Sequence, residues 1–175
     1  MALLAEHSIT ATPGRCVVEV YDADAYVGDQ AALDAAETQV VAGNGYHLYL
    51  LSLQPDMHVQ VTVRIWDSAP TPPANAEGRV AVTLESETGT LVVGQLDRGP
   101  AGEIKLPRPG IYEGYAWWEG RTASAEYYAT TLDQLSDDSP EDALLEAWEN
   151  NPVTERYVLD LTYIGVPEPI DDEDL

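Results

Sequence analysis

The chain has 175 residues, of which 45% are hydrophobic, so we expect a folded domain with a sizeable core rather than a disordered chain. Its 31 acidic residues against eight lysines and arginines give a net charge of −23, which excludes direct nucleic-acid binding through phosphate contacts and disfavours anionic membranes. The same charge attracts basic partners, although a salt-adapted proteome that is acidic throughout is an alternative source of it.

The cysteine content and the N-terminal residues indicate further what kind of protein this is and where it is located. Cys16 is the only cysteine, so the chain offers no internal disulfide and no cysteine-based metal site. Because it lies in an apolar, strand-like run, we expect it to be a small core residue. The N-terminus lacks a basic region followed by a sustained apolar segment, and no run is long enough to span a bilayer. These features predict a cytoplasmic protein without a signal peptide.

The first third of the chain combines strand-like segments with one polar stretch. The composition predicts an alanine-rich helix at 30–37 and strands at 8–12, 15–21, 46–53 and 57–66. The cleanest alternation is in the last of these strands, whose core face is expected to carry Val59, Val61, Val63 and Ile65.

The polar stretch holds aspartates at alternate positions. Asp22, Asp24 and Asp29 offer the oxygen ligands that a calcium ion prefers. The EF-hand pattern nevertheless fails, because Tyr26 and Val27 occupy its fifth and sixth positions and no glutamate stands at the twelfth. We therefore expect a solvated acidic loop and assign no metal, while cation binding by the three aspartates stays an open alternative.

The rest of the chain supplies further strands. Residues 79–84 and 90–93 flank a turn in which Gly89 is free to take a positive φ angle, and this predicts a hairpin. Three more strands are expected at 103–106, 110–118 and 155–164. About eight strands separated by turn signals predict a mainly β fold, an antiparallel β-sandwich. We expect one domain over residues 1–165, followed by an acidic tail at 166–175.

The strand at 110–118 is the most aromatic segment of the sequence. Tyr112 and Trp118 share one face with Ala116, whereas Tyr115 and Trp117 share the other. One face is expected to meet the core. The other must then be covered by another part of the chain or by a partner.

An acidic helical insertion at 122–152 interrupts the β pattern. It contains eight acidic residues and no lysine or arginine between 122 and 150. Ser139 as N-cap and Pro140 at the first position predict the start of one short helix. We expect the apolar stripe of that helix to pack on the sandwich; it consists of Leu144, Leu145 and Trp148.

The sequence contains no recognisable catalytic constellation. His7, His47 and His58 belong to no paired-histidine motif, and there is no nucleophile elbow or phosphate-binding glycine loop. We therefore expect a protein that is not an enzyme and needs no cofactor. A structural or assembly role is one alternative function. Another is a carbohydrate-binding or calcium-binding module, in which sugar rings would stack on Trp66, Tyr112, Trp118, Tyr127 or Tyr128.

Taken together, several strand segments resemble the competence protein J family. The segments are 8–10, 16–22, 89–93, 104–112 and 156–161. They include a Leu-Pro-x-x-Gly-x-Tyr entry at 106–112 and a Tyr-x-x-Asp closing strand at 157–160. That family inhibits a DNA-entry nuclease by binding it, and it has no catalytic residues to carry over. The chain departs from the family in its acidic insertion and its acidic tail.

The resemblance gives the negative charge a physical role. A nuclease presents a basic cleft to DNA, and an acidic protein competes for that cleft with the help of long-range attraction. We therefore predict an inhibitor or immunity-type protein whose partner is a basic protein, most simply a nuclease. Acidic side chains would steer the encounter and aromatic ones would anchor it. The predicted partner-binding residues are Asp133, Asp137, Asp138, Glu141, Asp142, Glu146, Trp148, Trp118 and Tyr112.

Overall fold

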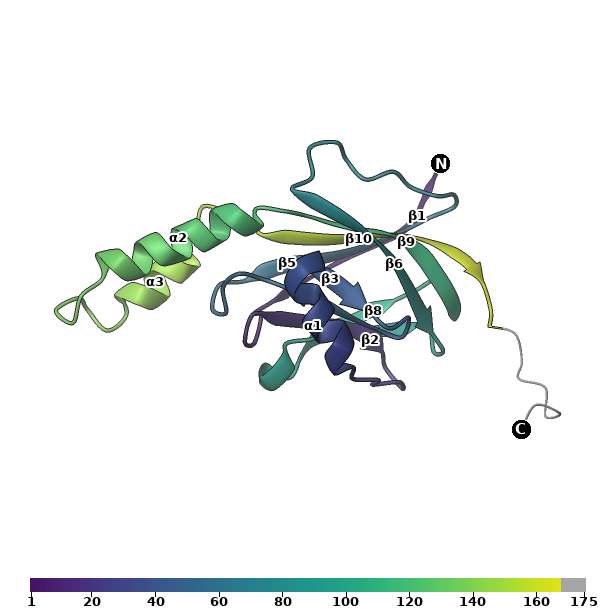
Figure 1. Ribbon diagram of the computed structural model, residues 1–175, viewed down its shortest axis with the longest axis horizontal. Coiled ribbons are helices and arrows are strands. Elements are labelled where there is room, and N and C mark those ends of the chain that lie inside the picture. The colour runs from purple at the N-terminus through teal and green to yellow at the C-terminus, as the bar shows by residue number, and fades with distance from the viewer. Residues whose placement is uncertain (168–175) are drawn as a thin grey trace.

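A computed structural model describes residues 1–167, which form ten strands in two five-stranded sheets (Figure 1). Sheet A contains, in spatial order, β1 (Leu3–Ala11), β5 (Val59–Trp66), β10 (Arg156–Gly165), β9 (Gly110–Glu119) and β6 (Gly78–Ser86). Sheet B contains β3 (Val41–Gly43), β4 (His47–Leu51), β2 (Val17–Asp22), β7 (Thr90–Gly94) and β8 (Pro100–Lys105). Of the predicted acidic tail, all but the first two residues lie outside the described part.

The core lies between the sheets and follows the alternation of the strands. In β5 the predicted face from Val59 to Ile65 is buried, and in β10 Tyr157, Leu159 and Leu161 face the same core. Sheet B contributes Val18 and Val20 of β2 and further residues of β4 and β7. The prediction of a mainly β protein with two packed sheets is therefore confirmed.

Two details of the predicted sandwich are wrong. Ten strands form instead of about eight: each of the nine segments named above forms a strand, and the short β3 adds an edge strand that the sequence pattern does not reveal. The arrangement is also not purely antiparallel, since β10 pairs in parallel with β5 and antiparallel with β9. A period of two places a side chain on a face, but it carries no information about the direction of the neighbouring strand.

The predicted hairpin at 79–93 is wrong as well. Its two strands lie in different sheets, because β6 pairs with β9 in sheet A while β7 pairs with β2 and β8 in sheet B. Gly89 does take a positive φ of 76°, as expected. The turn is held against sheet B by the buried Asp22, whose carboxylate accepts hydrogen bonds from the backbone N–H of Thr88 at 3.0 Å and from its hydroxyl at 2.8 Å. The turn therefore connects the two sheets.

The predicted alanine-rich helix is confirmed as α1 (Gln30–Gln39). Asp29 is its N-cap and accepts a hydrogen bond from the backbone N–H of Ala32 at 3.1 Å. Ala32 and Ala36 pack on the outer face of sheet B against Val17 and Tyr49. A 3₁₀ turn, η1 (Leu96–Arg98), connects β7 to β8.

The acidic insertion contains two helices, where one was predicted. They are α2 (Arg121–Gln134) and α3 (Ala143–Glu149), which lie side by side and extend beyond the end of the sheets (Figure 1). We call residues 121–149 the helical arm. The predicted start at Ser139 is also displaced, because α3 begins at Ala143 with Asp142 as its N-cap.

Candidate functional site

The helical arm leaves the sandwich at a glycine. Gly120 follows β9 with a φ of 73°, and a Cβ atom at this position would lie 2.1 Å from the carbonyl oxygen of Thr154. Only glycine fits this combination of positive φ and close backbone approach. The turn redirects the chain from sheet A into α2, so that the helix starts at the end of the sheet rather than packing across it.

Two side chains of α2 fix the base of the arm to the sandwich. Arg121 donates from Nε to the carbonyl oxygen of Leu51 at 2.9 Å, and the hydroxyl of Tyr128 donates to Asp56 at 2.7 Å. Burial, and then the bond to the Asp56 carboxylate, raise the pKa of Tyr128 to about 12. Tyr128 therefore stays a neutral hydrogen-bond donor over the physiological range.

The two helices are joined mainly by aromatic residues. The rings of Tyr128 and Trp148 stack with centroids 4.6 Å apart and planes 9° apart, while the hydroxyl of Tyr127 donates to the carbonyl oxygen of Ala147 at 2.6 Å. Trp148 is buried, whereas Leu145 is 63% exposed. Of the stripe predicted to dock on the sandwich, Trp148 therefore packs on Tyr128 of α2, while Leu145 faces solvent.

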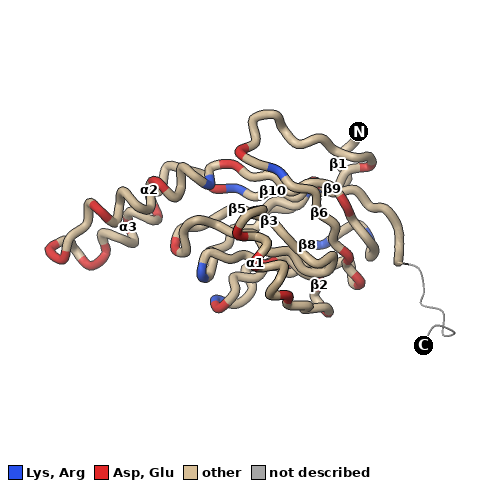
Figure 2. The backbone as a smooth tube through the Cα atoms, viewed as in Figure 1, with Lys and Arg blue, Asp and Glu red and all other residues tan. Residues whose placement is uncertain are grey.

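All six acidic residues of the predicted partner-binding set lie on the arm and are exposed. Within the described residues none of them takes part in an ion pair, and residues 122–150 contain no lysine or arginine to neutralise them. Figure 2 shows acidic positions along the arm and at its far end. The six residues are Asp133, Asp137, Asp138, Glu141, Asp142 and Glu146. The arm thus carries an uncompensated negative field away from the sandwich.

The three predicted aromatic anchors are not together on one surface. Tyr112 is 1% exposed and Trp118 is 7% exposed, and both point from β9 into the core between the sheets. The hydroxyl of Tyr112 also donates to the carbonyl oxygen of Arg108 at 2.6 Å. Trp148 belongs to the arm but lies inside the helix pair. The acidic part of the predicted set is therefore gathered in one place, while Tyr112 and Trp118 present no free surface.

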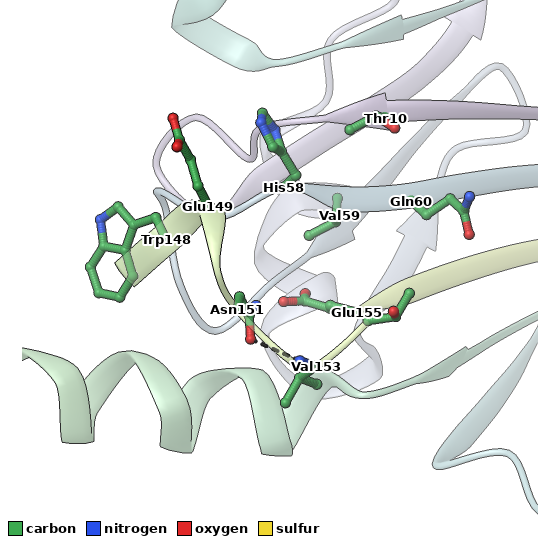
Figure 3. A pocket seen from close by; sticks show the side chains of 10 residues that line it. Thr10, His58, Val59, Gln60, Trp148, Glu149, Asn151, Val153 and Glu155 are labelled. Carbon is green, nitrogen blue, oxygen red and sulfur yellow. Dashed lines mark hydrogen bonds between the residues drawn. The ribbon is translucent and has the colours of Figure 1, made fainter. Parts of the chain in front are cut away.

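A hollow of about 260 Å³ lies at the base of the arm (Figure 3). Trp148 and Glu149 border it on one side, and residues of β1 and β5 with His58 border it on the other. His58 is already engaged, since its Nδ1 lies 3.0 Å from the hydroxyl of Thr12. The buried carboxylate of Glu155 is engaged too, because it accepts hydrogen bonds from Gln54 and Tyr157. His58 and Glu155 are therefore both committed to internal hydrogen bonds.

Cys16 differs from its prediction as a core residue of a strand. It lies half-buried in the turn before β2, with a φ of 70°. Burial, and then the neighbouring carboxylates of Glu155 and Asp56, raise the pKa of its thiol. The thiol is thus kept in its less nucleophilic form.

Two of the three aspartates considered for calcium, Asp22 and Asp29, have other partners. Burial opposes the ionisation of Asp22, but the hydrogen bonds from Ser86, Thr88 and Asp24 outweigh it and lower the pKa of its carboxyl. Asp29 caps α1, as described above. Among residues 1–167 no group of three or more histidine, cysteine or acidic side chains is arranged to hold a metal ion.

Trp66, which was considered for sugar stacking, makes internal contacts, and so does the neighbouring Trp117 of β9. Their indole N–H groups both donate to the buried carboxylate of Asp160, at 2.8 and 2.7 Å. Arg64 donates to the same carboxylate from Nε and Nη2, at 2.7 and 2.8 Å. This cluster covers the outer face of β9 around Trp117, which the sequence analysis expected to need cover.

The fold is similar to those of two solved structures. It resembles that of ComJ. The crystal structure of ComJ from Bacillus subtilis, described as an inhibitor of the DNA-degrading activity of NucA, superposes with a TM-score of 0.58 at 13% identity. The match covers 93% of this chain and 98% of ComJ. The predicted resemblance to competence protein J is therefore confirmed at the level of the fold.

A second structure with a similar fold is described as crocagin biosynthetic gene J. It gives a TM-score of 0.50 at 18% identity, over 97% of this chain and 100% of the other. No protein-family model and no curated protein matches the sequence. In the part of the chain that the structure describes, no helix is both long and apolar enough to cross a membrane.

Proposed function

We propose that this protein is a non-catalytic inhibitor that binds a basic protein, and that the partner is a nuclease whose DNA-binding cleft the acidic arm competes for. The observation that carries the proposal is the helical arm itself, which holds eight carboxylates and no lysine or arginine between residues 122 and 150. The likeness of the fold to ComJ supports the choice of a nuclease as the partner class.

The physical reason lies in the position of the charge as much as in its size. Carboxylates on a projecting element reach a concave basic surface that a flat sheet face does not enter. Long-range attraction raises association rates by about 10 to 1,000-fold at low ionic strength and is screened by salt. Arm residues without internal ion pairs are free to make these contacts.

The test compares two variants that lose the same amount of charge at different places. The arm variant carries Asp137→Asn, Asp138→Asn, Glu141→Gln, Asp142→Asn and Glu146→Gln. The control variant neutralises five exposed acidic residues of the sandwich, namely Glu6→Gln, Asp34→Asn, Glu37→Gln, Glu87→Gln and Glu103→Gln. Each protein is titrated into plasmid-degradation assays of the basic nucleases that the source organism encodes, and association rates are measured by stopped flow.

We expect wild type to inhibit one of these nucleases. The arm variant should associate about tenfold more slowly at roughly 50 mM NaCl, and the control variant should stay close to wild type. Equal slowing by both variants would show that only the total charge matters and would remove the arm from the proposal. If wild type inhibits none of the nucleases, the inhibitor function itself is wrong.

A further inference from the structure

The tip of the helical arm contains a hollow of about 350 Å³ whose lining is half apolar and half polar or acidic. We call it the leucine hollow. It is lined by Leu132, Leu135, Ser136, Asp137, Ser139, Pro140, Glu141 and Leu144. Leu132 is 45% exposed, and Leu135 and Leu144 are half-buried. Three leucines from both helices thus surround one open space at the point farthest from the sandwich.

The connection between α2 and α3 holds the hollow in shape. The hydroxyl of Ser139 accepts a hydrogen bond from the backbone N–H of Ser136 at 3.0 Å, and the carbonyl oxygen of Ser136 accepts one from the N–H of Ser139 at 3.0 Å. The N–H of Ala143 donates to the carbonyl oxygen of Pro140 at 3.0 Å as α3 begins. A site that exists before binding loses little conformational entropy when it is filled.

The surroundings of the hollow determine what fits it. Asp137 and Glu141 line it, and Asp133, Asp138 and Asp142 are exposed neighbours along the same tip. An apolar centre inside a ring of charge is the anatomy of a protein–protein interface. Nucleic acid and anionic lipid are repelled by such a ring. A second copy of the chain would bring two acidic tips together, which like-charge repulsion opposes.

We propose that the leucine hollow is the anchor point of the arm and takes an apolar side chain that a basic partner carries between lysines or arginines. The class of partner rests on the proposed function. The leucine hollow provides an apolar contact among the carboxylates that steer the partner. The buried Tyr112 and Trp118 cannot provide such a contact.

Two synthetic peptides test the hollow without any nuclease. The first is acetylated and amidated Lys-Lys-Leu-Leu-Lys-Lys, and the second has glycine in place of both leucines, so that the two carry equal charge. Each is titrated into isotope-labelled protein at roughly 50 mM NaCl and followed by amide chemical shifts. We expect the leucine peptide to bind about fivefold more tightly, because one leucine side chain becomes partly buried, and to shift amides of residues 132–144.

A matched pair of variants locates the contact. Leu132→Ala removes a wall of the hollow, whereas Leu145→Ala truncates a leucine of α3 that is 63% exposed and does not line it. Alanine keeps helix propensity in both, and circular dichroism checks that both fold. We expect Leu132→Ala to bring the leucine peptide close to the affinity of the glycine peptide and Leu145→Ala to change nothing.

Equal affinities of the two peptides, or equal effects of the two variants, would overturn the proposal. So would a dimer of the free chain in sedimentation that Leu132→Ala abolishes, because a second copy would then fill the hollow. If the leucine peptide binds as expected while no nuclease is inhibited, the leucine hollow is a binding site, but the proposal of a nuclease partner is wrong. If wild type and Leu132→Ala inhibit a nuclease equally well, the protein is an inhibitor, but the leucine hollow does not anchor the partner.

Discussion

Asp160 shows how one buried side chain organises the outer face of sheet A. Its carboxylate lies on β10 and accepts four hydrogen bonds, from Arg64 and Trp66 on β5 and from Trp117 on β9. Burial opposes its ionisation, but the bonds from Arg64, Trp66 and Trp117 outweigh burial and hold the pKa of the carboxyl below the ordinary 3.8. The side chain thereby links the three central strands of the sheet.

We predict that Asp160→Asn lowers the free energy of unfolding by about 3 kcal/mol, because the substitution leaves the Arg64 guanidinium without its counter-charge in a largely buried place. Urea denaturation at neutral pH measures the change. The matched control is Asp97→Asn, which breaks an exposed 3.5 Å pair with Arg15 and should change stability by less than about 0.5 kcal/mol.

The pH dependence of stability provides a second test of the Asp160→Asn variant. A carboxyl whose pKa is lowered by folding stabilises the protein fully above its unfolded pKa, and this contribution is lost as the pH falls through the folded value. The gap in stability between wild type and Asp160→Asn should therefore be constant above about pH 5 and shrink below about pH 4. A gap that stays the same down to pH 2 would show that the ionised carboxylate is not the source of the effect.

Sequence patterns predict the burial of a residue well where it depends on alternation along a strand. They predict its contacts poorly, because these depend on which strands are neighbours. The buried face of β5 from Val59 to Ile65 follows directly from the period of two. Asp160 is visible in the sequence as part of a closing-strand motif, but its donors are not, because they reach it only through the pairing of β5, β10 and β9. The alternation in β9 correctly predicts that Tyr112 and Trp118 share one face, but it does not show that this face is the buried one.

At the scale of elements, the helical arm is held to the rest of the molecule by few contacts. Its helices are held together by the stack of Tyr128 on Trp148 and by the bond from Tyr127 to Ala147. Its base is tied down through Arg121 and Asp56. Segments with few buried apolar contacts open locally without unfolding the rest of the molecule.

We predict that Trp148→Ala releases α3 while the sandwich stays folded. Amide hydrogen exchange in residues 143–149 should become roughly tenfold to a hundredfold faster, because the loss of the indole removes the stack and the apolar area that it buries. Strands β5 and β10 should keep their protection. Leu145→Ala is the control, since it truncates an exposed side chain of the same helix. Loss of protection throughout the sandwich would contradict an independently opening arm.

The second helix of the insertion escaped prediction for a physical reason. Helix α2 has no continuous apolar stripe, because most of its surface faces solvent and only Ser124 and Thr131 are buried. The acidic character of the whole insertion follows directly from its composition, since a count of charged residues does not depend on tertiary contacts. The leucine hollow was not, because Leu132 and Leu144 are brought together by the pairing of two helices.

At the scale of the whole molecule, the net charge of −23 acts on stability as well as on partners. Like charges repel one another in the compact state, and dissolved salt screens that repulsion. We predict that the melting temperature rises by roughly 5 °C between about 20 mM and 500 mM NaCl, as measured by differential scanning fluorimetry. The arm variant with five neutralised acids should show a smaller rise. A melting temperature that falls or stays flat would mean that repulsion does not limit stability.

The sequence predicts the general architecture, but it does not predict how the strands are connected between the two sheets. Alternating strands and turn residues predict two packed sheets, because each strand must bury one face. The link from β6 to β7 reads as a hairpin in sequence, since a tight turn between amphipathic strands is compatible with pairing within one sheet or passage between two. Asp22, more than sixty residues upstream, contributes the contacts that hold the turn on sheet B.

The position of β10 in the middle of sheet A constrains how the chain is made. Its neighbours on either side are β5, which is synthesised about a hundred residues earlier, and β9, from which the whole arm separates it. Until the ribosome has released residues 156–165, β5 and β9 each expose an unpaired edge, and such edges invite pairing between nascent chains. The like charge of such chains opposes this pairing, because their carboxylates repel one another.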